Sequence, residues 1–299
     1  MTIDLDSART FIYANARVLE RRRVAALLDG APAEPVTASL RAYRNSDGGF
    51  GHALEPDVRG PESEPASVLH AFEALASVGA LDDPMVTGAA AWLDGAADPD
   101  GGMPFVTEAA ARYPRGPWMV PSEGGSHLTF ALAGALWEAG TDAPWLQRGT
   151  QWCWSRLEGP GDLGGYVVKF ALEFLDRVPD EARARAAIDR LSALIGPDGT
   201  VAVAGGTEDE RLRPLVLSQR PGRRSRALFE ESQIESELDA LERGQQEDGG
   251  WTFDWLAWSP GQSVEWRGII TLRALATLAA HGRLSGFPRD PLTGVPVSA

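Results

Sequence analysis

A turn built on aspartate and glycine recurs along the chain, and this repeat constrains the fold more than any other feature. In most copies a segment with one charged and one apolar side ends in the turn, and a more apolar segment follows. Aspartate can accept a hydrogen bond from its own backbone two residues on, and glycine adopts the positive φ needed to leave a helix. Successive turns lie about 35 to 65 residues apart, a spacing typical of helical-pair arrays. The copies begin at Asp47, Asp100, Asp162, Asp198 and Asp248.

The segments on the two sides of each turn differ in polarity. Segments before the turns carry charged residues on one side, which predicts outer helices over residues 35–45, 84–93, 143–157, 182–195 and 231–243. Segments after the turns are richer in alanine, leucine and valine, which predicts inner helices over residues 66–79, 127–139, 166–176, 211–219 and 264–281. A further helix over residues 7–28 is expected to close the ring against residues 264–281.

These segments predict an all-α fold with one domain over residues 1–299. We expect an α/α toroid of about five to six helical hairpins around a central cavity, because helical pairs bury their apolar faces by stacking on their neighbours. The segment from about residue 288 contains several prolines and small residues and is expected to be a loose tail.

The charge and the cysteine content exclude several classes of function. A net charge of -14 argues against a nucleic acid or an anionic membrane as the main partner. Cys153 is the single cysteine, which excludes an intrachain disulfide and a cysteine-based zinc cluster. Neither a signal peptide nor a membrane span is recognisable, so we expect a cytoplasmic protein without integral membrane contact. We further expect a monomer with no cofactor and no bound metal.

One of the turns also carries a repeat signature. Residues 245–251, Gln-Gln-Glu-Asp-Gly-Gly-Trp, match the QxxxGxW repeat of squalene-hopene and oxidosqualene cyclases, and residues 44–50 are a degenerate copy. The chain therefore resembles the superfamily of terpenoid cyclases and protein prenyltransferases, which are α/α toroids. Residues 43–57 further resemble a stretch found in stand-alone bacterial prenyltransferase/squalene-oxidase-repeat proteins. The resemblance implies a hydrophobic, isoprenoid-type small molecule in the central cavity.

The catalytic motifs of that superfamily are not matched. Class II cyclases use a DxDD-type acid, and the nearest string here is Asp98-Pro99-Asp100. Class I synthases use a DDxxD-like magnesium motif, which Asp82-Asp83-Pro84 does not complete. The prenyltransferase zinc site needs an aspartate close before its cysteine, where this chain has Gln151 before Cys153. The resemblance therefore implies a fold more strongly than an activity.

Three long loops interrupt the repeat, each between a glycine turn and its inner helix. They cover residues 51–65, 105–126 and 252–263, and in a toroid they would gather at one mouth of the cavity. Long loops on a regular scaffold commonly carry function. The candidate catalytic groups are Glu55, Asp57, Glu123, His127 and Asp254, and the candidate substrate-binding groups are His52, Arg59, Trp118, Trp255, Trp258, Glu265 and Trp266.

Each set of candidates has a structural alternative. His52, Glu55 and Asp57 combine an imidazole with two carboxyls suited to proton transfer or to one metal ion, but they also suit a capping turn. His127 at a helix N-terminus would have a lowered pKa and act as a base, or it is a histidine bonded to backbone. The tryptophans of residues 252–263 would stabilise a cation or stack on a sugar, or they fill helix seams.

The arginine-rich run from Arg220 to Arg226 follows a predicted inner helix. It is interpreted as a solvated loop, with phosphate binding as the alternative.

Three functions remain open from the sequence. The first is an enzyme acting on an isoprenoid or similar hydrophobic molecule, in which Asp57 or Glu55 protonates the substrate and aromatic rings stabilise the cation. The second is a carbohydrate-active α/α barrel with a carboxylate pair about 5–10 Å apart. The third is a toroid that holds a hydrophobic or sugar-like ligand without catalysis.

Overall fold

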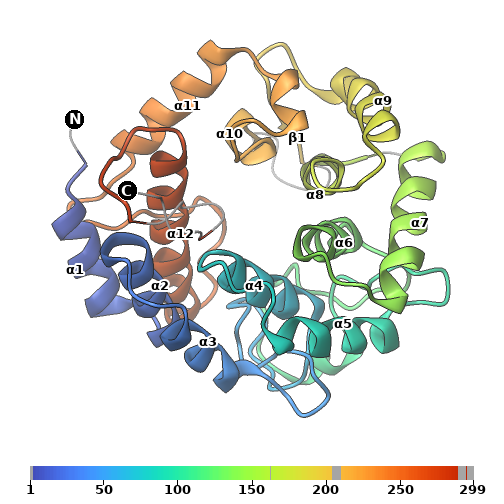
Figure 1. Cartoon of the computed structure of the whole chain (residues 1–299), viewed down its shortest axis with the longest axis horizontal. Helices are drawn as coiled ribbons and strands as arrows, with labels where there is room; N and C mark the ends of the chain where they lie inside the picture. Colours follow the sequence, from blue (N-terminus) through green and yellow to red (C-terminus); the bar gives the residue numbers. More distant parts are fainter. Residues whose placement is uncertain (1–2, 162, 204–209, 289–293, 295–299) are drawn as a thin grey trace.

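The chain folds into helices joined by glycine turns and long loops. The computed structural model describes residues 3–161, 163–203, 210–288 and 294, and this part is mostly helical (Figure 1). The helices before the turns are α3 (Glu34–Leu40), α5 (Pro84–Ala96), α7 (Pro144–Glu158), α9 (Glu181–Leu191) and α11 (Glu231–Arg243). Those after the turns are α4 (Pro65–Ala76), α6 (Leu128–Ala139), α8 (Gly165–Leu175), α10 (Pro214–Leu217) and α12 (Pro260–Ala280).

The aspartate–glycine turns have the predicted geometry. Gly48, Gly101 and Gly249 have φ of 94°, 93° and 89°, in the left-handed region that favours glycine. In each of these turns the aspartate Oδ1 accepts a hydrogen bond from the backbone N–H two residues on, at 2.9 to 3.1 Å. The copy at Asp162 lies outside the described residues.

The helices form two layers around the centre of the molecule. In Figure 1, α4, α6, α8 and α10 lie nearer the centre than α5, α7, α9 and α11. The inner helices contact one another in chain order, from α4 to α6, α8 and α10. α6 is buried along most of its length, as its lack of a polar face predicts.

Helices from the two ends of the chain lie side by side. α1 (Leu5–Asn15) and α2 (Val18–Asp29) both contact α12, and an unbroken series of helix contacts leads from α2 to α12. The last glycine turn closes on the first helix, because a Cβ at Gly249 would lie 2.3 Å from the backbone oxygen of Ser7. Glycine is required at this position for its φ and for the close approach.

The predicted single N-terminal helix over residues 7–28 is wrong. The backbone becomes extended at Ala16 and Arg17, with ψ of 164° and 163°, and this break separates α1 from α2. The cause is tertiary. A Cβ at Gly268 of α12 would lie 2.7 Å from the Ala16 Cβ, and the Arg17 side chain turns inward to the first long loop.

The predicted inner helix over residues 211–219 is also wrong. Arg211–Leu212 forms strand β2, which pairs antiparallel with β1 (Val201–Ala202), so the fold is mostly but not purely helical. Helix α10 begins only at Pro214, because proline fits the first helical turn and holds the preceding residue extended. The C-terminal helix α12 also begins earlier than predicted, at Pro260.

The described residues also include the short 3-10 helices η1 (Arg41–Tyr43), η2 (Glu108–Arg112), η3 (Ser192–Leu194) and η4 (Arg224–Leu228). Apart from Gly294, the predicted loose tail after residue 288 lies outside the described residues. Across the described part of the chain, none of the helices has the length and apolar character that crossing a membrane requires.

Candidate functional site

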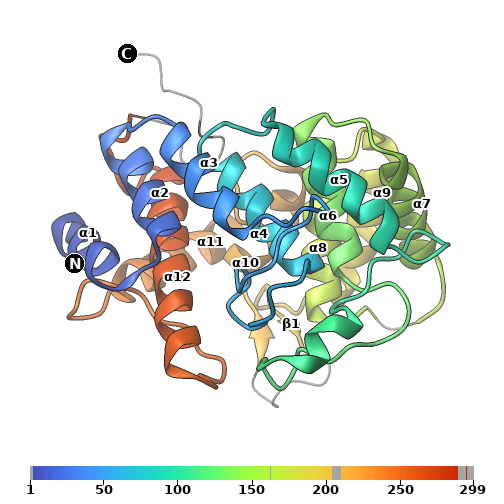
Figure 2. The same cartoon turned by 90° about the horizontal axis from the view of Figure 1, so that it is seen from below.

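The three long loops meet at one end of the molecule, toward the lower edge in Figure 2. The Gly116 N–H donates a hydrogen bond to the Asp57 carbonyl oxygen at 2.8 Å, and the Arg59 N–H donates to the Pro114 carbonyl oxygen at 3.0 Å. The Trp258 indole N–H donates to the Asp57 carboxyl. Three loops that are far apart in the sequence therefore converge on Asp57.

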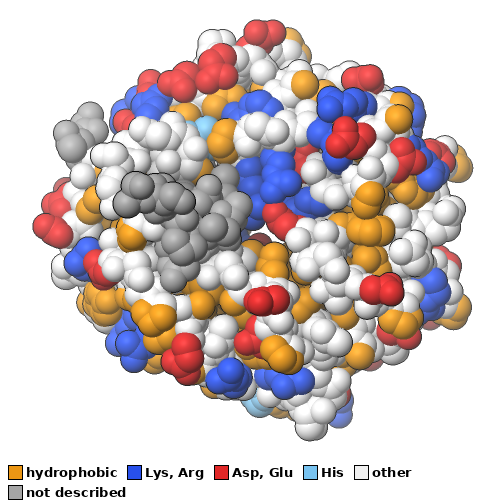
Figure 3. Space-filling view, in the orientation of Figure 1, with side chains coloured by type: hydrophobic (Ala, Val, Ile, Leu, Met, Phe, Trp, Pro, Cys, Tyr) orange, Lys and Arg blue, Asp and Glu red, His pale blue; other side chains and the backbone are white. Residues whose placement is uncertain are grey.

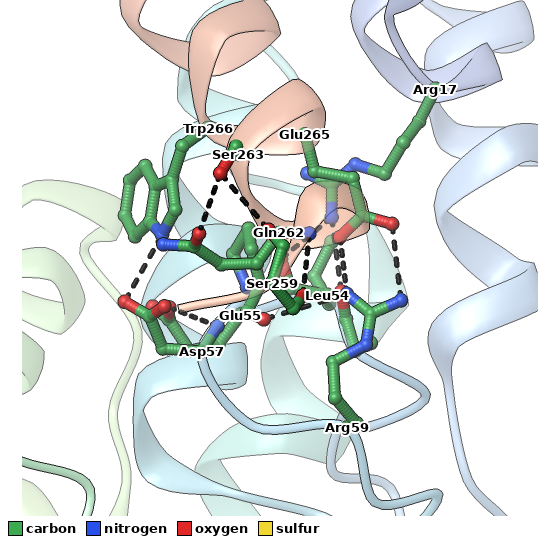
Figure 4. A network of polar contacts seen from close by, with 12 residues as sticks. Arg17, Leu54, Glu55, Asp57, Arg59, Ser259, Gln262, Ser263, Glu265 and Trp266 are labelled. Carbon is green, nitrogen blue, oxygen red and sulfur yellow. Dashed lines mark hydrogen bonds and ion pairs between the residues drawn. The ribbon is translucent and has the colours of Figure 1, made fainter. Parts of the chain in front are cut away.

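Asp57 lies at the centre of this end of the molecule. Its residue is 3% exposed, Oδ1 accepts the Trp258 Nε1–H at 2.8 Å, and Oδ2 accepts the Trp266 Nε1–H at 3.0 Å (Figure 4). Burial raises the pKa of Asp57 and the neighbouring Glu55 raises it further, against the lowering effect of the two indoles and of Gln262. Asp57 therefore keeps a proton to higher pH than an ordinary aspartate.

Glu55 connects the backbone of Asp57 to the inner helices. Its Oε1 accepts the Asp57 backbone N–H at 3.0 Å, and its Oε2 is hydrogen-bonded to His70 Nε2 at 2.8 Å. His70 Nδ1 lies 3.7 Å from Glu73 Oε2, which accepts a hydrogen bond from Arg273 Nη2 at 2.8 Å. A series of acidic and basic groups therefore leads from the first loop through α4 to α12 and ties the loop to the inner helices.

The backbone just before Glu55 is held in an unusual conformation. His52 and Ala53 have φ of 54° and 59°, which residues with a Cβ adopt rarely and at some cost in free energy. Arg17 Nη1 donates to the carbonyl oxygens of Ala53 and Leu54 at 3.0 Å each, and the rest of its guanidinium bonds a buried carboxylate on α2. The break between α1 and α2 therefore supplies the cation that fixes this loop (Figure 4).

Aromatic rings surround the indole that bonds Asp57. Trp255 meets Trp266 edge to face, with ring centroids 5.2 Å apart, and Phe253 stacks on Trp255 at 4.5 Å. His70 meets the other side of Trp266 at 5.6 Å. The loop over residues 252–263 thus brings an aromatic wall to the carboxyl, as its composition predicts.

The candidate base His127 lies in a second aromatic group. Its ring stacks nearly parallel on Phe170, with centroids 5.2 Å apart, and contacts Phe105 at 4.9 Å and Tyr166 at 6.0 Å. Burial lowers the pKa of His127 to about 4, and the charge of Lys169 contributes to the lowering. The imidazole is therefore neutral at pH 7.

Other candidate residues either pair with one another or lie away from Asp57. Arg59 and Glu265, from the first loop and α12, form an ion pair. The Trp118 ring packs on Gly116, next to a small apolar cluster of the second loop. His52 is exposed, and its Nε2 is hydrogen-bonded to Asn45 Oδ1 at 2.9 Å.

The remaining two candidate carboxyls are exposed. Asp254 lies close enough to Tyr166 to raise the pKa of its hydroxyl, although burial is the larger cause. Glu123 has no hydrogen bond or ion pair among the described residues. The structure thus brings Glu55, Asp57, Trp255, Trp258 and Trp266 together, and it leaves Glu123 apart from them.

Several buried polar groups at this site were not predicted. Gln262 is fully buried, and its side-chain amide faces the Asp57 carboxyl and lowers the pKa of that carboxyl by hydrogen bonding. For His70, Glu73 and Arg273, a polar residue on a predicted inner helix was the available signal. The unpredicted groups are the buried Glu64, His70 and Gln262 and the partly exposed Glu73 and Arg273.

Charged side chains continue from this end along the inner helices. Lys169 Nζ on α8 lies 3.9 Å from Glu173 Oε1, and burial lowers the pKa of Lys169. Among the described residues, no group of three or more His, Cys, Asp or Glu side chains is placed to hold a metal ion. Two depressions, of 240 and 300 Å³, lie away from Asp57, between α7 and α9 and beside α11.

Glu64 makes the stability of this region depend on pH. Its buried carboxyl accepts the Thr107 N–H at 2.9 Å and the Thr107 hydroxyl at 2.6 Å, and burial raises its pKa to about 7. Because the folded-state pKa of Glu64 lies above its unfolded value, protonation of this carboxyl favours the folded state. Its contribution to stability is complete below about pH 4.5 and is lost as pH rises toward 7. We compare the free energy of unfolding of Glu64→Gln with that of wild type. Because the amide does not ionise, the difference is expected to shift in favour of the variant by about 1–3 kcal/mol between pH 5 and pH 8.

Urea unfolding at several pH values measures this difference. The exposed Glu108→Gln is the matched control and is expected to follow the wild-type curve. A Glu64→Gln curve parallel to that of wild type would show that Glu64 is ionised throughout this range.

Comparison with known proteins gives a fold and no activity. No protein-family model matches the chain, and no curated protein matches it. Among solved structures, it is similar to a protein from Actinoplanes, with 18% identity and a TM-score of 0.55 over 92% of this chain and 98% of that chain. It is more loosely similar to the type II terpene cyclase MstE from Scytonema, solved as a variant with its substrate geranylgeranyl dihydroxybenzoate. That likeness has 14% identity and a TM-score of 0.48, over 93% of this chain and 96% of that chain.

Proposed function

We propose that this chain is an enzyme of terpenoid cyclase-like architecture that acts on a small apolar, isoprenoid-type molecule, with Asp57 as the proton donor. The series of contacts from α2 to α12 and back to α1 supports one domain in the form of a closed α/α toroid. In this proposal the substrate binds at the mouth where the three long loops meet.

The observation that carries the proposal is the environment of Asp57. A buried carboxyl with a raised pKa still holds a proton at a pH where an exposed carboxyl is ionised, so Asp57 has a proton to deliver to a carbon–carbon double bond. The indoles of Trp258 and Trp266 stabilise the carboxylate that remains after the transfer.

The aromatic rings near Asp57 supply the groups that would stabilise a carbocation after the proton transfer. The faces of Trp255 and Trp266 stabilise a carbocation next to Asp57 by cation–π attraction. His127 is neutral at pH 7, so it can accept a proton from a neighbouring carbocation and end the reaction. The ion pairs further along the inner helices, such as Glu73–Arg273, limit the substrate to a small one because an apolar chain there would leave charges without water.

The carbohydrate-active alternative receives less support. Glycoside hydrolysis needs two carboxyls that both face the substrate. Both Glu55 oxygens are taken by the Asp57 N–H and by His70, and Glu265 is paired with Arg59. A substrate would have to displace these partners of Glu55 and Glu265, so neither completes a carboxylate pair with Asp57.

Ligand binding tests the substrate class. We expect the purified protein to bind farnesol in isothermal titration calorimetry and not maltose, and we expect Trp255→Leu to weaken farnesol binding about tenfold by removing one aromatic face. The indoles that bond Asp57 are those of Trp258 and Trp266. Trp255→Leu therefore removes an aromatic ring next to the site without removing a hydrogen bond to the Asp57 carboxyl. Leu194→Ala, an exposed apolar residue of η3, is the control for nonspecific binding.

Mass spectrometry of solvent extracts from the purified protein complements the titration. A co-purifying isoprenoid supports the proposal. Binding of maltose in place of farnesol, or farnesol binding that is equal in wild type and Trp255→Leu, would reject it.

A further inference from the structure

Arginine side chains converge at the end of the inner helices that lies away from Asp57. Arg177 Nε, just after α8, donates to Glu138 Oε2 at 2.8 Å. Arg220 Nη1 and Arg223 Nη2, from the segment after α10, donate to Glu138 Oε1 at 2.5 and 2.7 Å. We name Arg177, Arg220 and Arg223 the arginine cluster. Figure 3 shows Lys and Arg side chains gathered near the centre of this face, over α8 and the segment after α10.

The lengths of α6 and α8 show how far the arginine cluster lies from the end of the molecule where the three long loops meet. α6 follows His127 and has Glu138 in its last turn, and α8 has Tyr166 in its first turn and Arg177 just beyond its end. The two helices therefore run in the same direction, with the aromatic group at one end and the cluster at the other. Eleven residues of helix cover about 16 Å, so the cluster is a separate site.

The charges of the cluster do not balance. Burial raises the pKa of Glu138, but the arginines, with Arg177 first, outweigh it and hold the pKa at about 2. One full negative charge therefore meets three positive charges, in a chain whose net charge is -14. Nearby, Glu173 lies 3.7 Å from Arg177 and 3.9 Å from Lys169, and the charge of Asp176 also acts on Arg177, so the local excess is about one positive charge. Burial lowers the pKa of Arg220, and the charges of the other two arginines contribute.

Unused donors point outward from the cluster. Arg220 and Arg223 each give one guanidinium nitrogen to Glu138 among the contacts of the described residues, and each has two further nitrogens. Their side chains are 18% and 30% exposed, so the free donors are reachable but partly desolvated. Guanidinium groups in this state bind the oxygens of phosphate in pairs.

We propose that the arginine cluster binds the dianionic phosphate group of a small molecule at this end of the protein. The unused donors of two neighbouring guanidinium groups match the several oxygens of a phosphate better than the two oxygens of a carboxylate. The sequence alone favoured a solvated loop for this run, but the arginines lie against the inner helices and meet on one carboxylate. The inference goes beyond the chemistry at Asp57 and stands without it.

Two variants with opposite expected effects test the site. Arg223→Gln removes the most exposed donor and is expected to weaken phosphate binding about tenfold or more, as lost bonds to a charged group do. Glu138→Gln removes the competing carboxylate, raises the local charge, and is expected to bind phosphate more tightly than wild type. An ion-pair cluster with a purely structural role would lose stability in both variants without gaining affinity in either.

Isothermal titration calorimetry at low ionic strength supplies the measurement, with inorganic phosphate, glycerol phosphate and acetate as separate probes. Tighter binding of glycerol phosphate than of inorganic phosphate would assign the group to an organic ester, and the reverse would assign it to the free ion. Arg185→Gln, on the exposed face of α9, is the control.

The inference is overturned by any of three results. These are no saturable phosphate binding by wild type up to about 10 mM, equal affinity of wild type and Arg223→Gln, or acetate bound as tightly as phosphate. If Arg223→Gln does not fold, Glu138→Gln decides the question, since only an anion site predicts its gain in affinity.

Discussion

Arg17→Met is expected to lower the free energy of unfolding by about 3–5 kcal/mol, the cost of leaving a buried charge without its partner. Arg17 Nε and Nη2 bond the two oxygens of Glu20 at 2.9 and 2.8 Å, and the side chains are 11% and 1% exposed. The variant also leaves the carbonyl oxygens of Ala53 and Leu54 without their donor. Urea unfolding followed by circular dichroism measures the loss.

The pH dependence identifies the cause of the loss. In the wild type, burial raises the pKa of Glu20, but the charge and hydrogen bonds of Arg17 outweigh it and the pKa is lowered. This stabilisation is therefore present above about pH 4.5 and is lost as pH falls below it. Without Arg17 the buried Glu20 takes up a proton, so the difference between variant and wild type is expected to shrink toward pH 4.

Matched variants separate the buried pair from an ordinary ion pair. Arg9→Met removes an exposed pair with Asp29 and is expected to cost less than about 1 kcal/mol. Arg17→Met combined with Glu20→Met is expected to recover part of the loss, because no unpaired charge remains. An Arg17→Met variant as stable as Arg9→Met would contradict a role of this pair in holding the loop before Glu55.

The features that the sequence predicts are those with local causes. The turn at Asp248 needs a glycine at position 249 because of its own φ, so its residues are sufficient to identify it. The outer helix α11 has the predicted bounds, since its polar and apolar sides alternate with the helical period. The break at Ala16 escaped prediction because its cause is Gly268, which is far away along the chain.

In the candidate site, too, residue types can be predicted from local sequence, but their contacts across the fold cannot. Trp258 and Asp57 were both selected, but their hydrogen bond joins residues that no sequence pattern connects. The sequence does not identify His70 as a site residue, because its partner Glu55 lies in a loop whose path the sequence does not fix. The contact of Arg220 was also not predictable from local sequence, because its partner Glu138 lies on α6. Pairing across elements is set by the fold and not by local composition.

Asp57→Asn is expected to lower the rate of any proton-initiated reaction by about 100- to 10,000-fold, the usual contribution of a positioned acid. An amide has no acidic proton to deliver, and its NH₂ group would face one of the two indole donors. Because the wild-type carboxyl is penalised by burial, the neutral amide is expected to cost little stability near pH 7. Asp189→Asn, on the exposed side of α9, is the control.

The reaction is followed by mass spectrometry with farnesol and with shorter isoprenoid alcohols in D₂O. Transfer from Asp57 to a carbon–carbon double bond places one deuterium on carbon in each product, and the charge is removed when a base takes another proton. The rate is expected to fall as pH rises through the raised pKa of Asp57, because only the protonated carboxyl is the acid. Product without carbon-bound deuterium, an unchanged rate in Asp57→Asn, or binding of these molecules without turnover would each contradict Asp57 as the acid.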